Sequence, residues 1–168
     1  MHFHRVDHTR HEPTAFHTLL TASQQVHEGA LGHALIELVF LRVSQLNGCA
    51  YCIDMHATAL RKAGIEPRKL DTLAGWRESR FFDPRERLAL AWAQALTTLP
   101  SGAPPQDAYD ALSAHFDDHG ISVLTMAIAL INAWNRLGVG LQPAMPSAPR
   151  AGAVECAGRP QPRRPARG

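Results

Sequence analysis

The stretch from Leu35 to Ala63 reads LIELVFLRVSQLNGCAYCIDMHATALRKA, and this stretch decides the fold. Before Asn47-Gly48 its apolar residues recur at helical spacing and do not alternate with polar residues as they would in a strand. Asn-Gly is a pair that ends helices, and a second helix is expected to begin at Cys49 and to continue to Ala63. The stretch therefore predicts two antiparallel helices joined by a tight corner.

The second helix of this hairpin carries three reactive side chains on one face. Cys49 and Cys52 are three residues apart, and His56 follows Cys52 by four, so all three lie one above another on a helix. Two thiols one turn apart can close a disulfide with little backbone movement. The unpaired N–H groups of a helix N-terminus also favour the thiolate, which is the nucleophilic form of cysteine.

The first helix of the hairpin contributes a carboxylate. Glu37 lies ten residues before the corner, roughly 15 Å along its helix, and His56 lies roughly 12 Å along the other. The two side chains are therefore expected to lie nearly level, with Cys52 one turn below His56. A glutamate inside the apolar run LIELVF is costly unless it is paired. We expect Glu37 to orient the imidazole of His56, which can then accept a thiol proton.

The rest of the chain predicts further helices and no convincing strand. The first is expected after Pro13, and Asp83-Pro84 followed by Glu86 is a strong start signal for a later one. With the hairpin helices, about 34–46 and 49–63, this gives an all-α bundle of six to seven helices, the others covering about residues 13–28, 67–76, 84–99, 105–116 and 121–137. The last of these helices is expected to end before Gly138.

Composition limits the organisation of the chain. Its 168 residues, 45% hydrophobic and 19% charged, are enough for one globular domain, expected over residues 13–141. Residues 1–12 are expected to be flexible, and residues 142–168 to be a disordered tail rich in proline and arginine. A basic tail on a mildly acidic body is not typical of a nucleic-acid-binding domain.

No membrane span is expected either, because the most apolar segment, 121–137, contains two asparagines and an arginine. The N-terminus lacks the apolar core of a signal peptide, so we expect a cytoplasmic protein.

The cysteine pair also allows other interpretations. Three cysteines are too few for a disulfide scaffold, and the expected absence of strands disfavours a thioredoxin-like site. A structural zinc site would need Cys49, Cys52, His56 and a fourth ligand, either Glu37 or Cys156. Haem attachment needs a histidine directly after the second cysteine, which this chain lacks. Two inert core cysteines also stay possible. We expect no cofactor and no bound metal.

The residues from Leu35 to Ala63 resemble the carboxymuconolactone decarboxylase superfamily, and within it the alkylhydroperoxidase D (AhpD)-like branch. The match consists of Glu37, the first cysteine twelve residues later, Cys-x-x-Cys, and a histidine four residues further on. The later stretches FDPRERLALAWAQALT and INAWNRLGV are also similar, so the resemblance covers about residues 13 to 140. It implies an all-helical fold, assembly as a homo-trimer or homo-hexamer, and reduction of hydroperoxides through a cysteine disulfide.

The resemblance also implies roles for single residues. Cys52 is the thiol that attacks the peroxide, Cys49 is the resolving thiol, and Glu37 with His56 forms a proton relay. The helix dipole alone would make Cys49 the more acidic thiol, whereas the expected proximity of Cys52 to His56 agrees with the resemblance. The chain departs from the family pattern at Tyr51, where well-studied relatives carry a second histidine. Tyrosine is a poor base at neutral pH, with an ordinary pKa near 10.

Polar residues on the last helix are candidates for supporting roles. Asn132, Trp134, Asn135 and Arg136 stand in an apolar helix, and structural hydrogen bonding was favoured over catalysis for them. Tyr51, Asn132 and Arg136 are kept as possible supporting residues of the site.

The leading hypothesis is a peroxidase that takes a hydroperoxide substrate and is re-reduced by an unidentified thiol or a lipoyl-type reductant. The alternatives are a protein thiol–disulfide reductase or redox sensor, a decarboxylase without redox chemistry, and a non-catalytic oligomer with a structural metal.

Overall fold

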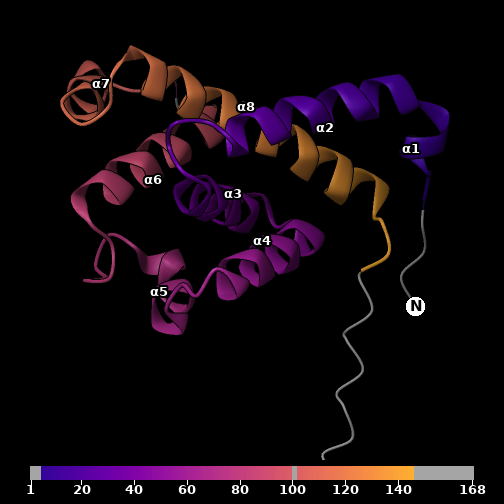
Figure 1. The fold of residues 1–168 in the computed structure, drawn as a ribbon, viewed down its shortest axis with the longest axis horizontal. Helices are drawn as coiled ribbons and strands as arrows, with labels where there is room; N and C mark the ends of the chain where they lie inside the picture. Colours follow the sequence, from indigo (N-terminus) through magenta and orange to yellow (C-terminus); the bar gives the residue numbers. More distant parts are fainter. Residues whose placement is uncertain (1–4, 100–101, 146–168) are drawn as a thin grey trace, which may run out of the picture.

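The structure is a computed structural model that describes residues 5–99 and 102–145, and these residues form helices and no strand (Figure 1). The predicted all-α class is therefore confirmed. Eight α-helices and one 3-10 helix follow in this order: α1 (His8–His11), α2 (Pro13–His27), α3 (His33–Asn47), α4 (Ala50–Lys62), α5 (Pro67–Asp71), η1 (Leu73–Gly75), α6 (Pro84–Thr97), α7 (Gln106–Ser113) and α8 (Asp118–Leu141).

The short helix α1 lies in the N-terminal segment, where the sequence predicted no helix. The side chain of Asp7 accepts a hydrogen bond from the backbone N–H of Thr9 and thereby caps the helix. The backbone N–H of Arg5 donates to the carbonyl of Leu141 at the end of α8. These contacts stabilise α1, which is the one α-helix that the sequence did not predict. Residues 142–145 form no helix, and most of the tail predicted to be disordered, 146–168, lies outside the described residues, as do residues 1–4.

The ends of two helices, α5 and α8, differ most from the prediction. The helix expected over 67–76 ends at Asp71 and continues as the 3-10 helix η1. Helix α8 begins earlier than expected, where Asp117 accepts from the N–H of Gly120, and it continues through Gly138 to Leu141. Glycine weakens a helix without always ending it, and Gly138 is retained inside α8 because of the close contact described below.

Helix α3 is the centre of the bundle and is buried on nearly all sides. One side, which includes Val39 and Phe40, joins a core cluster with α2, α6 and α8, and the other, with Leu38 and Leu41, joins a cluster with α4 and η1. Figure 1 shows α2 and α8 running side by side on one side of α3, with α4 on the other. A helix that is apolar all round is typical of a core position.

Helix α8 is long and apolar enough to cross a membrane by length and composition, with a mean hydropathy of 1.2 over its richest window. The sequence-based expectation that no segment qualifies is therefore wrong on those two criteria. Within the bundle α8 contacts α2, α3, α4 and α6, and it buries Asn132 and Asn135, as expected of a core helix.

Candidate active site

The corner between α3 and α4 holds the two cysteines as the sequence predicted. Gly48 ends α3 in the left-handed conformation, with φ at 67°, and its N–H and that of Cys49 bond back to carbonyls of the last turn. Cys49 is the N-cap of α4, and Cys52 lies in the first turn. A disulfide bond joins the two residues, whose Cα atoms are 5.4 Å apart. Both are nearly inaccessible, at 2% and 4% exposure.

Glu37 and His56 lie level with each other on the two helices. His56 Nδ1 is 2.8 Å from Glu37 Oε2, and both side chains are buried. An ionised carboxylate only accepts hydrogen bonds, so Nδ1 carries the proton and donates. The other ring nitrogen, Nε2, then holds the lone pair. It is buried and has no hydrogen-bond partner among the residues that the structure describes. This nitrogen is consequently available as a base.

A cavity of about 450 Å³ is lined by both His56 and Cys52. Polar residues in its wall include Glu37, His56, Cys52, Tyr51 and His27, with His8, Thr9, Ser23 and Gln24 from the N-terminal helices. The rest of the wall is mainly apolar and comes chiefly from α2, α3, α4 and α8, including Phe16, Leu20, Phe40, Met55, Ile131 and Trp134. Its size and lining are suitable for a small organic molecule.

A second hollow, of about 250 Å³, lies beside the other cysteine of the pair. It is lined by Cys49 but not by Cys52, whereas the larger cavity is lined by Cys52 but not by Cys49. The two spaces share Tyr51, Gly138 and Pro143 in their walls. Each cysteine of the disulfide therefore borders a different cavity.

Helix α8 covers the disulfide at Gly138. A Cβ atom built on this glycine would lie 2.6 Å from Cys49 Sγ and 3.5 Å from Cys52 Sγ. No real Cβ contact is as short as the first of these, so a residue without a side chain is needed at this position. From the sequence Gly138 is expected only as a helix end, because no local pattern shows which helix covers the corner.

The asparagines of α8 hold the corner in place. Asn47 Nδ2 donates to Asn132 Oδ1 and to Asn135 Oδ1, both at 2.9 Å, and Asn135 Nδ2 donates to Ser44 Oγ. Arg136 donates to the carbonyl and to the side-chain oxygen of Asn132. Neither Asn132 nor Arg136 lines the cavity. Their contacts agree with the structural role that the sequence favoured, while Tyr51 does lie in the cavity wall.

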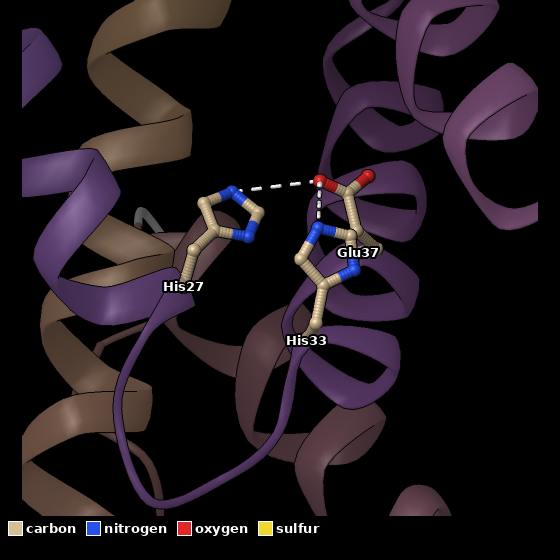
Figure 2. A group of neighbouring side chains, drawn as sticks. All are labelled: His27, His33 and Glu37. Carbon is tan, nitrogen blue, oxygen red and sulfur yellow. Dashed lines mark ion pairs between the residues drawn. The ribbon is translucent and has the colours of Figure 1, made fainter. Parts of the chain in front are cut away.

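Two histidines beside Glu37 were not identified from the sequence. His27 Nε2 lies 3.4 Å and His33 Nε2 4.0 Å from Glu37 Oε1, the oxygen that His56 does not use (Figure 2). Burial lowers the pKa of His27, partly offset by the charge of Glu37, so the imidazole is neutral near pH 7. His33 and Glu37 have the four-residue spacing of one helix face, which is a signal in the sequence. His27 has no such signal, because it reaches the site from another helix.

The fold and this site define an all-helical protein with a buried Cys-x-x-Cys disulfide beside a glutamate–histidine pair. The sequence profile of the carboxymuconolactone decarboxylase family matches residues 13–95. The uncharacterised protein YdfG of Bacillus subtilis (strain 168) is 31% identical over 137 residues, which is 82% of this chain and 93% of that protein. The chain belongs to the carboxymuconolactone decarboxylase family, and it is similar to the AhpD-like proteins within it.

Two solved structures support the assignment. A protein of unknown function from Agrobacterium tumefaciens, ATU0492, whose name relates it to the antioxidant defence protein AhpD, is 36% identical with a TM-score of 0.83. The match covers 87% of this chain and 100% of that one. An uncharacterised peroxidase-related protein from Ralstonia eutropha JMP134, described as an alkylhydroperoxidase AhpD core, is 22% identical with a TM-score of 0.70, covering 81% and 74% of the two chains. The second match shows the fold alone.

Proposed function

We propose that this protein reduces organic hydroperoxides, with Cys52 as the attacking thiol, Cys49 as the resolving thiol, and His56 and Glu37 as the proton relay. The observation that carries the proposal is the buried Nε2 of His56, unpartnered among the described residues, in the wall of the same apolar cavity as Cys52. Family membership and the antioxidant-defence name of the Agrobacterium tumefaciens protein support the same class of reaction.

In the first step His56 Nε2 takes the proton of the Cys52 thiol, and Glu37 stabilises the imidazolium through its bond to Nδ1. The Cys52 thiolate attacks the outer oxygen of the hydroperoxide. The O–O bond breaks, the sulfur becomes a sulfenic acid, and the alkoxide leaves as the alcohol after taking a proton from His56.

In the second step Cys49, as the thiolate, attacks the sulfur of the Cys52 sulfenic acid. A disulfide forms, and hydroxide leaves as water after protonation. One hydroperoxide and two thiols thus become one alcohol, one water and one disulfide, which is the state the structure describes. A thiol-class donor must then return two electrons to the disulfide.

The separate hollow at Cys49 suits this last step. A small thiol, or the thin arm of a lipoyl-bearing protein, fits a space of about 250 Å³ that reaches Cys49. Both sulfurs are too deeply buried for direct contact with the surface of a folded protein. This burial favours a small peroxide over the alternative of a general protein thiol–disulfide reductase. A thiol donor of this kind also agrees with the expected cytoplasmic location.

The test is dithiothreitol-dependent consumption of cumene hydroperoxide by wild type, Cys52→Ser and Cys49→Ser. We expect the Cys52 variant to lose at least about 100-fold in kcat/KM, since it lacks the thiol that lines the cavity together with His56. The Cys49 variant keeps Cys52 and should consume one equivalent of peroxide in the absence of reductant, which a mass gain of one oxygen would record. Equal consumption by wild type and Cys52→Ser would show that the proposal is wrong.

We also propose that the chain assembles as a homo-trimer or homo-hexamer, as the resemblance implies. Large apolar side chains of α8 and α2 are exposed, among them Met126 at 60%, Val139 at 46% and Leu20 at 37%. Burial of such residues between copies would remove them from water. Light scattering coupled to size-exclusion chromatography measures the mass, and a monomer at micromolar concentration would contradict this proposal.

A further inference from the structure

The carboxylate of Glu37 has two oxygens, and the proposed reaction uses only one of them. Oε2 accepts from His56, whereas Oε1 faces His27 from the end of α2 and His33 from the start of α3. Figure 2 shows both imidazoles directing a nitrogen at this one oxygen. We propose that His27 Nε2, His33 Nε2 and Glu37 Oε1 bind a divalent transition-metal ion of the zinc class.

The distances within this group are those of ligands around an ion. His27 Nε2 and His33 Nε2 lie 3.4 and 4.0 Å from Glu37 Oε1, which is too long for good N–H···O hydrogen bonds of about 2.7–3.2 Å. Two ligands that each lie about 2.0–2.1 Å from zinc are roughly 3.4 Å apart in tetrahedral geometry. All three donor atoms lie within 4.8 Å of one another. A small rotation of His33, whose side chain is 59% exposed, closes the remaining gap.

The three ligands are held by different parts of the fold. His33 and Glu37 are one turn apart on α3, and the connection 28–32 returns the chain so that His27 faces them. The rings of His27 and His33 are 5.1 Å apart between centroids. The bond from His56 to Oε2 fixes the orientation of the carboxylate, as hydrogen bonds behind metal ligands commonly do. The group is therefore arranged before any ion binds.

The chemistry of the donors selects the class of ion. Two imidazole nitrogens and one carboxylate oxygen suit zinc and neighbouring transition metals, and they do not suit calcium or magnesium, which prefer oxygen ligands. Glu37 supplies a buried negative charge to balance the cation. His27 and Glu37 also line the large cavity, so a fourth ligand can reach the ion from there. Three protein ligands with one open position are typical of accessible zinc sites.

The experiment measures Zn²⁺ binding to the full, untagged chain by competition with a chromophoric chelator. The protein carries Cys156→Ser and has its Cys49–Cys52 disulfide closed, so that thiols do not contribute. We compare His33→Gln with the matched control His115→Gln, since both histidines are exposed and His115 lies far along the chain, just before α8. We expect one ion per chain, with affinity at least about tenfold weaker in His33→Gln and unchanged in the control.

A second measurement uses Co²⁺ in place of Zn²⁺. Wild type should show visible d–d absorption without a sulfur-to-metal charge-transfer band, as expected for nitrogen and oxygen ligands, and His27→Gln should lose that spectrum. Circular dichroism checks that His27→Gln is folded. Equal zinc affinity in wild type and His33→Gln, or a cobalt spectrum that His27→Gln leaves unchanged, would overturn the proposal. Neither measurement depends on peroxide reduction, so the outcome is separate from that of the proposed function.

Discussion

The corner between α3 and α4 and the connection between α2 and α3 both bring side chains to Glu37, but they do so in different ways. At the corner the contacts are tight: a disulfide and a 2.8 Å bond from His56 to Oε2. At the connection, His27 and His33 stand 3.4 and 4.0 Å from Oε1. The difference shows that one carboxylate can form a short hydrogen bond through one oxygen, Oε2, while its other oxygen, Oε1, faces two imidazole nitrogens at longer distances.

The largest expected effect comes from Glu37 itself, because it belongs to both regions. Glu37→Gln keeps the shape of the side chain and removes its charge, so the imidazolium of His56 loses its stabilisation. We expect kcat/KM for cumene hydroperoxide to fall about 100-fold or more. The matched control is Glu28→Gln, at an exposed position just after α2, which should leave the rate unchanged. If Glu37→Gln kept the wild-type rate, the carboxylate would not be part of the proton relay.

Gly138→Ala tests how closely α8 covers the corner. Its new methyl group would lie 2.6 Å from Cys49 Sγ, so helix or corner must shift, and we expect a loss of about 1–3 kcal/mol in the free energy of unfolding. Gly140→Ala is the matched control on the same helix, because nothing lies within 4 Å of its Cβ position. Alanine there should be neutral or stabilising by up to about 1 kcal/mol. Urea denaturation of the oxidised proteins measures both, and equal midpoints would contradict the close contact.

The smallest expected losses of stability come from removing the hydrogen bonds that attach the corner and helix α2 to α8. Asn47→Ala removes two hydrogen bonds at the corner and leaves two acceptors of α8 without this donor, for an expected loss of about 1–2 kcal/mol. Ser23→Ala removes the single bond from Trp134 Nε1 that ties α2 to α8, for about 0.5–1 kcal/mol. The same urea series ranks the two variants. A larger loss for Ser23→Ala would reverse the view that the corner is the more firmly held region.

Much of the fold was predictable because its signals are local. The Asn47-Gly48 break, the cysteines one turn apart and the level of Glu37 with His56 follow from helix geometry over 20 residues, 37 to 56. The start of α6 was predicted from Asp83-Pro84, and the structure shows the full capping box with Glu86. The end of α8 was mispredicted, because Gly138 serves a contact with a residue 89 positions earlier in the chain.

Local signals were enough to predict the all-helical class, the hairpin and the pairing of Glu37 with His56, since periodicity, turn residues and capping act within a few residues. The contact of α8 with the disulfide, the approach of His27 to Oε1 of Glu37 and the separate cavity beside each cysteine are visible only in the folded chain. These features depend on how separate helices pack, and packing is set by the whole core of the protein and not by any one stretch of it.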